Sequence, residues 1–108
     1  MSNSLLTNLL AFYEEDPTDP FNVYALALEY LKSSPERAGE LFDILLRDHA
    51  SYLPTYYHAA DFFAAKEDND KAESIYKDGL ALALTQSNVK AHQELQRAYR
   101  NFLDELEY

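Results

Sequence analysis

Residues 54–79 read PTYYHAADFFAAKEDNDKAESIYKDG, two runs rich in apolar side chains on either side of a polar segment. The proline at position 54 suits the first turn of a helix. Aromatic and small side chains recur every three or four residues in both runs, which is the spacing of an amphipathic helix. The stretch therefore predicts two helices joined by a short turn, and so short a turn makes the two helices antiparallel neighbours.

A related pattern occurs 34 positions earlier in the chain. This shift places Pro20 on Pro54 and Ala38 on Ala72. Further matches pair Ala25 with Ala59, Lys32 with Lys66, Arg37 with Lys71, Leu41 with Ile75, Phe42 with Tyr76 and Leu46 with Leu80. A repeat of this length indicates stacked copies of one helix-turn-helix unit.

Prolines and capping residues divide the chain into six expected helices. Asp19 and Ser34 each precede a proline and suit the N-cap position. Asp70 with Glu73 suits a capping box, and Asn88 suits the cap of the last helix. The expected helices cover residues 3–15, 20–32, 35–49, 54–66, 70–85 and 88–106. The predicted fold class is all-α, an array of antiparallel helix-turn-helix repeats with a C-terminal capping helix.

Seven residues of the second copy follow a distinctive order: Tyr56, Ala59, Ala60, Phe63, Ala72, Tyr76 and Gly79. This order resembles the tetratricopeptide repeat, in which an aromatic residue, a small pair and an aromatic residue are followed by alanine and a further aromatic residue. The small pair lets the two helices approach closely, and the rings fill the space around the contact. The protein is similar to short bacterial members of this family.

The resemblance covers about residues 5–85 of a chain that we expect to form a single domain. In the first full copy, Val23, Leu26, Ala27 and Tyr30 fit the pattern if the following loop is one residue shorter. Before it, Leu5, Leu9, Phe12 and Pro17 resemble the second half of a repeat. The expected parts are a half repeat (3–19), two repeats (20–53 and 54–86) and a capping helix (87–107). The polar side of that last helix, with Glu94, Arg97 and Arg100, is expected to face water.

The composition argues against a catalytic or metal-binding role. The chain of 108 residues has no cysteine and only two glycines, so it offers neither a thiolate ligand nor a glycine-rich phosphate loop. His49, His58 and His92 lie far apart in the sequence, and the pair His58 and Asp61 falls short of the three or four ligands of a metal site. We therefore expect no enzyme activity, no catalytic residue, no metal and no cofactor.

The charge limits the classes of partner. Nineteen acidic and nine basic residues give a net charge of −10, which repels nucleic acid and anionic membrane and attracts basic partners. No uncharged apolar stretch approaches the ~20 residues that a membrane helix needs. Without the basic start of a signal peptide, the chain is expected to be soluble and cytoplasmic.

The resemblance also implies where a partner binds. In tetratricopeptide proteins the first helices of successive repeats line a concave groove that holds a partner peptide. Carried over by position, the groove residues are Phe21, Tyr24, Leu28, Leu31, Tyr57, Asp61 and Ala64. Family members that bind the C-terminal carboxylate of chaperones use Lys, Arg and Asn in the groove, a set that these positions lack. An aromatic, acidic groove favours a basic or amphipathic segment of a protein or peptide.

Two other roles stay open at the level of the sequence. The first is a structural role in which the terminal helices mediate self-association, because residues 5–12 are unusually apolar for a single covered helix. The protein is then a homodimer instead of a monomer. The second is an acidic mimic of nucleic acid, which is less favoured because the carboxylates are spread over helix ends and outer faces.

Overall fold

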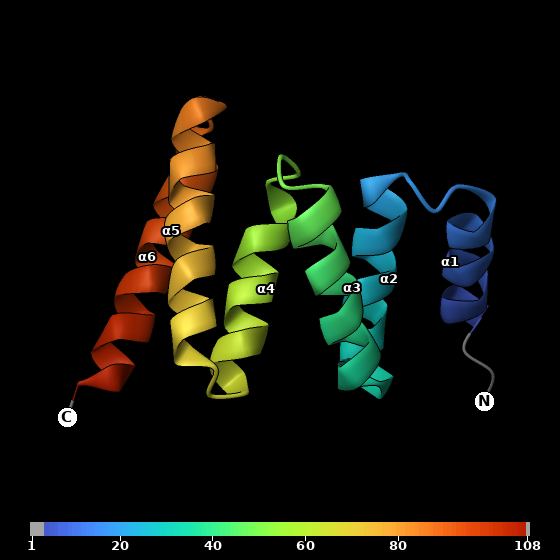
Figure 1. Ribbon diagram of the computed structural model, residues 1–108, viewed down its shortest axis with the longest axis horizontal. Helices are drawn as coiled ribbons and strands as arrows, with labels where there is room; N and C mark the ends of the chain where they lie inside the picture. Colours follow the sequence, from blue (N-terminus) through green and yellow to red (C-terminus); the bar gives the residue numbers. More distant parts are fainter. Residues whose placement is uncertain (1–3, 108) are drawn as a thin grey trace. The chain divides into compact units, whose positions relative to one another are not determined.

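The structure, a computed structural model, describes residues 4–107. Within this range the chain forms six α-helices and no strand (Figure 1). The helices are α1 (Ser4–Glu15), α2 (Pro20–Ser33), α3 (Pro35–Asp48), α4 (Pro54–Ala65), α5 (Asn69–Thr85) and α6 (Val89–Leu106). The predicted all-α fold class is confirmed, and every helix begins within one residue of its expected start.

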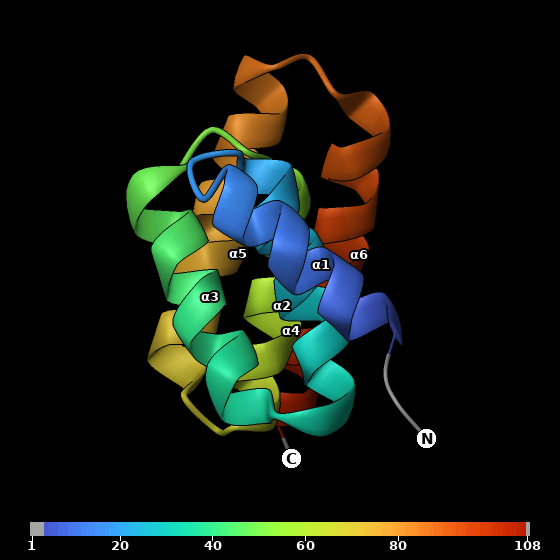
Figure 2. The same ribbon diagram turned by 90° about the vertical axis from the view of Figure 1, so that its right-hand side faces the viewer.

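The helices belong to two compact units, residues 1–52 with α1 to α3 and residues 53–108 with α4 to α6. In the first unit α2 packs against both α1 and α3, and Figure 2 shows α1 in front of α2. In the second unit α5 packs against both α4 and α6. The grouping of these helices into a half repeat, two full repeats and a cap within a single domain stays a prediction.

The core of the second unit depends on a close approach of α4 and α5. Ala59, Ala60 and Ala72 are fully buried, as the small-residue pattern predicts. At Gly79 an added Cβ would lie only 2.8 Å from the Cβ of Tyr56, so a side chain at this position would force the two helices apart. Small residues therefore determine how near the two helices lie, and larger apolar residues of α4, α5 and α6 close the core around them.

The core of the first unit confirms the alignment with the shorter loop. The four residues of α2 that fit the repeat pattern only with that loop are all buried: Val23, Leu26, Ala27 and Tyr30. Their partners on α3, Ala38, Phe42 and Leu45, are buried as well. The hydrophobic effect thus selects the side of α2 that the one-residue shift predicts.

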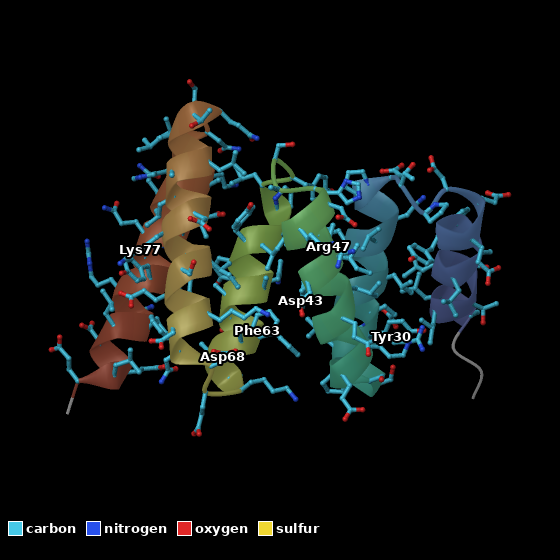
Figure 3. All side chains as sticks on the ribbon, in the orientation of Figure 1. Tyr30, Asp43, Arg47, Phe63, Asp68 and Lys77 are labelled. Atoms are coloured by element: carbon cyan, nitrogen blue, oxygen red, sulfur yellow. The ribbon has the colours of Figure 1, made fainter. Side chains whose placement is uncertain are left out.

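A cation over an aromatic ring recurs at matching positions of the two units. The guanidinium of Arg37 lies 5.0 Å from the centre of the Tyr30 ring, and the ammonium of Lys71 lies 4.0 Å from that of Phe63. Both rings are labelled in Figure 3. Such contacts are worth about 0.5–1 kcal/mol at partly exposed sites and help to join the two helices of each pair.

Two of the predicted helix caps form as expected. The Asp19 carboxylate accepts a hydrogen bond of 2.9 Å from the backbone N–H of Phe21, and the Asn88 side chain accepts one of 3.0 Å from that of Ala91. Ser34 is the N-cap residue of α3, but its side chain makes no capping hydrogen bond. Side-chain caps such as those of Asp19 and Asn88 each contribute about 1 kcal/mol to stability.

The predicted capping box of Asp70 and Glu73 is wrong. Helix α5 begins at Asn69 with Asp68 at its N-cap, so Asp70 lies inside the first turn. The Glu73 carboxylate turns instead to α6, where it accepts a hydrogen bond of 2.7 Å from the hydroxyl of Tyr99. It also lies 3.7 Å from the ammonium of Lys77. A long-range contact therefore replaces the local one.

The turn before α5 explains this shift of the helix start. Glu67 has a positive φ of 65°, and the next N–H, of Asp68, donates back to the carbonyl of Phe63 at 2.9 Å. This Schellman arrangement uses the carbonyls at the end of α4 and delivers the chain directly into α5. The turn between α5 and α6 repeats it, with Ser87 at φ 55°.

Candidate protein-binding surfaces

The predicted site residues of the first unit share one side of α2, which we call the α2 strip: Phe21, Tyr24, Leu28 and Leu31. Phe21 is 57% exposed, and the other three are half-buried. The Tyr24 ring meets Tyr52 edge to face, with the ring centres 5.6 Å apart. The strip is thus an apolar, aromatic surface that the core of its unit does not bury.

Burial and charge both act on the two tyrosines of this unit. Burial raises the pKa of Tyr24, and the nearby Tyr52 raises it further. Burial also raises the pKa of Tyr52, with a second contribution from the carboxylate of Asp19. The tyrosines stay neutral at physiological pH, and the Asp19 carboxylate places negative charge near Tyr52.

The predicted site residues of the second unit share one side of α4, which we call the α4 strip: Tyr57, Asp61 and Ala64. Tyr57 is 45% exposed and Asp61 is exposed, whereas Ala64 is half-buried. The Tyr57 ring lies edge to face with His58, at 5.4 Å between ring centres. Among residues 4–107 Asp61 has no ion pair with a basic side chain, so its carboxylate is available to a cationic partner.

A buried tyrosine reports the electrostatic field beside the α4 strip. The pKa of Tyr76 is raised to about 12, chiefly by burial and in addition by Asp61, Tyr57 and Glu105. These residues come from α4 and α6, whereas Tyr76 belongs to α5. Helices α4, α5 and α6 therefore bring acidic side chains and aromatic rings into one neighbourhood.

Aromatic rings of α5 and α6 pack against each other and hold α6 on α5. The centre of the Tyr76 ring lies 5.6 Å from that of Tyr99 and 5.5 Å from that of Phe102. Pairs of this kind add about 0.5–1.5 kcal/mol beyond the burial of their surface. The exposed polar residues of α6, Glu94, Arg97 and Arg100, lie on the other side of the helix, as expected for a cap.

Sequence reasoning missed several residues that shape these surfaces. Tyr52 lies in a turn, and Glu105 lies 44 positions after Asp61, so no local pattern links either to its strip. Glu29 is buried although it is charged, and the ammonium of Lys32 lies 3.1 Å from its carboxylate. The spacing of three between Glu29 and Lys32 was the available signal for this last pair.

No metal or membrane chemistry is visible in the described part of the chain. Residues 4–107 contain no group of three histidine, aspartate or glutamate side chains placed to hold a metal ion. Burial lowers the pKa of His58, and Asp61 opposes this effect. None of the described helices combines the length and the apolar character that crossing a membrane requires.

Within residues 4–107 the pairs α2–α3 and α4–α5 bury small and aromatic side chains at matching positions, such as Ala38 and Ala72 or Phe42 and Tyr76, and this repetition defines a helical-repeat protein. The chain is 36% identical to a tetratricopeptide repeat domain protein from Salinibacter ruber solved by NMR, over 81% of this chain and 89% of that chain, with a TM-score of 0.75. A crystal structure of a tetratricopeptide repeat domain protein from the same organism is 35% identical, over 78% and 96% of the two chains, with a TM-score of 0.74. The chain belongs to the tetratricopeptide repeat family.

This family is a class of protein–protein interaction modules, and its members are typically non-catalytic scaffolds. No protein-family model matches the sequence, and no curated protein is significantly similar to it. The family thus gives the general role, whereas the binding residues and the kind of partner have to be argued from the surfaces described above.

Proposed function

We propose that the protein is a non-catalytic binding module that holds a basic or amphipathic segment of a partner protein. The α4 strip of one unit offers contacts for cationic side chains, and the α2 strip of the other unit offers contacts for apolar side chains. The observation that carries the proposal is the pair Tyr57 and Asp61, one turn apart on α4. Tyr57 is an exposed ring, and Asp61 is an exposed carboxylate that forms no ion pair within the described residues 4–107.

The chemistry of the α4 strip favours lysine or arginine. A cation over the Tyr57 ring gains about 0.5–1 kcal/mol, and a hydrogen bond to the Asp61 carboxylate adds to it. Tyrosine also contributes a large contact area at a low cost in side-chain entropy. The nearby acidic residue Glu105, which acts on the same Tyr76, strengthens the attraction for positive charge.

The composition of both strips argues against a carboxylate ligand. Neither strip contains a lysine or an arginine, and Lys32 beyond the end of the α2 strip is paired with Glu29. An acidic C-terminus would meet uncompensated negative charge at Asp61. The proposal therefore predicts that partner binding weakens as salt is added, because salt screens attraction between exposed charges.

The decisive experiment compares captured partners for two matched double variants. The test variant Tyr57→Ala with Asp61→Lys removes an exposed ring and reverses a charge on α4. The control variant Val89→Ala with Glu94→Lys removes an exposed apolar side chain and reverses a charge on α6, outside both strips. Each is used as bait in a lysate of the source organism, with capture quantified by mass spectrometry and the helical circular dichroism of both variants checked.

We expect a partner captured by the unmodified protein and by the control variant to fall at least tenfold with the test variant. A partner retained by the test variant at full strength contradicts the assignment of the α4 strip. A partner lost only with the control variant would place the binding surface on α6 instead.

A further inference from the structure

We propose that α1 pairs with α1 of a second copy of this chain, antiparallel across a two-fold axis. The contact surface is a stripe on α1 that we call the α1 stripe, formed by Leu5, Leu9 and Phe12. This self-association is separate from the binding of a partner segment by α2 and α4.

The α1 stripe is the apolar side of α1 that its own unit leaves uncovered. Leu5 is 51% and Phe12 is 53% exposed, and Leu9 between them is half-buried. Another side of the helix, with the half-buried Leu6, Leu10 and Tyr13, packs on α2. One neighbouring helix covers one side of α1, and a second apolar side therefore needs a second neighbour.

The internal repeat shows which kind of neighbour this side of a helix takes. The α1 stripe matches Ala38, Phe42 and Leu45 of α3, and Ala72, Tyr76 and Gly79 of α5. In both of those helices the three positions are buried, and each helix packs on the helix before it. The α1 stripe thus occupies the positions through which α3 and α5 each pack on a neighbouring helix.

The sizes of the side chains exclude a neighbour that packs as α4 does. Leu5 stands where α3 and α5 have alanine, and Phe12 stands where α5 has Gly79. At Gly79 even a Cβ would come within 2.8 Å of Tyr56, so a phenylalanine at this position admits no helix as near as α4, whereas α3 has the buried Leu45 at the matching position. The neighbour of α1 must lie farther away and supply large side chains of its own to fill the gap.

Helix α1 itself meets this requirement. In an antiparallel pair, Leu5 of each copy lies opposite Phe12 of the partner copy, and the two Leu9 side chains lie near the axis. A large residue then faces a large residue along the whole stripe. Two-fold pairing also makes the contact self-complementary, which is the commonest arrangement in soluble oligomers.

The charges of α1 determine its orientation. Glu14, Glu15 and Asp16 lie at its C-terminal end, whereas its first turn holds no acidic residue, and residues 1–31 contain no lysine or arginine. An antiparallel pair puts each acidic end beside the positive N-terminal end of the partner helix, which is favourable. A parallel pair would gather all these carboxylates without a compensating charge.

The first test is sedimentation equilibrium of the full chain from micromolar to millimolar concentration. One helix on each side buries less area than a standard interface, so we expect a weak dimer. Its mass at high concentration should approach twice the 12.4 kDa of the chain. Phe12→Glu should raise the dissociation constant at least tenfold, whereas Leu84→Glu, at a leucine that is 67% exposed on α5, should leave it unchanged.

The second test measures orientation with single cysteines, since the chain has none of its own. Asn8 lies beside the axis of an antiparallel pair, so Asn8→Cys should form a disulfide-linked dimer on mild oxidation. The two copies of residue 15 would lie about 20 Å apart along the pair, so Glu15→Cys should not. A monomer at millimolar concentration, equal cross-linking at both positions, or an effect of Leu84→Glu as large as that of Phe12→Glu overturns the proposal.

Discussion

Replacement of Gly79 by alanine sets two opposing effects against each other in the middle of α5. Alanine favours the helix over glycine by about 1 kcal/mol. The new Cβ, however, would lie 2.8 Å from the Cβ of Tyr56 and 3.2 Å from Cδ1 of Leu95, where ordinary contact begins at 3.4 Å. The leucine methyl group can turn away, but a Cβ is bonded to the backbone, so α4 must recede by about 0.6 Å.

Overpacking of this kind typically costs about 1–3 kcal/mol. Because the strain acts on a helix and not on a side-chain tip, we expect the clash to exceed the gain in helix propensity. The predicted net effect is a loss of about 1 kcal/mol in the free energy of unfolding, which corresponds to roughly 4–8 °C in Tm for a domain of this size.

Urea unfolding followed by circular dichroism measures the net effect. Ala81→Gly, at an exposed position of the same helix, measures the propensity effect alone and should cost about 0.5–1 kcal/mol. If Gly79→Ala is as stable as the unmodified protein or more stable, then α4 and α5 are not held at the distance described here, and the reasoning on the α1 stripe loses its strongest support.

Three further predictions concern ionisation and backbone conformation. The pKa of Tyr76 is about 12 in the folded protein and 10.0 in the unfolded chain. The free energy of unfolding should therefore fall by about 2–3 kcal/mol as the pH rises from 10 to 12. Urea unfolding of Tyr76→Phe at each pH should show a smaller fall. Burial lowers the pKa of His58, so on acidification the unfolded chain binds a proton before the folded protein does. The free energy of unfolding should therefore decrease as the pH drops through about 6.5. His58→Asn should reduce this decrease, and Asp61→Asn, which removes the opposing charge, should enlarge it. Ser87 holds a positive φ of 55°, so Ser87→Gly should raise the free energy of unfolding by about 0.5–1 kcal/mol, measured by thermal denaturation.

Helix starts and the core were predictable because local chemistry and the repeat pointed to the same answer. Pro20, Pro35 and Pro54 each open a helix, and each can do so because the N–H that proline lacks has no partner in a first turn. The shift by 34 positions then identified which residues occupy equivalent positions in the two copies. Val23 and Tyr30, which fit only a shorter loop, are buried as that alignment requires.

The capping of α5 was not predictable from local sequence because the turn before this helix contains no glycine. A left-handed residue after a helix is usually glycine, whereas here it is Glu67 with a φ of 65°. Asp70 and Glu73 have the spacing of a capping box, but Glu73 hydrogen-bonds to Tyr99, 26 positions later. This hydrogen bond forms only after α5 and α6 have packed together, so the local sequence around Glu73 gives no sign of it.

The site residues likewise include some that local sequence predicts and some that only the packing of several helices brings together. Helical spacing was enough to predict that Tyr57, Asp61 and Ala64 share a side of α4. It carried no information on Glu105, which joins Asp61 in raising the pKa of Tyr76. The acidity beside the α4 strip arises from three helices together, and periodicity describes one helix at a time.

Salt separates the two proposed interactions because they depend on different forces. The α4 strip attracts a basic segment through exposed charge, and that attraction weakens as the Debye length falls from about 10 Å at 0.1 M to 3 Å at 1 M. The α1 stripe is apolar, and two chains that each carry a charge of −10 repel until salt screens them. Added salt should therefore release the partner segment while it strengthens the dimer. A dimer that dissociates in salt would mean that charge, and not Leu5 and Phe12, holds the two copies together.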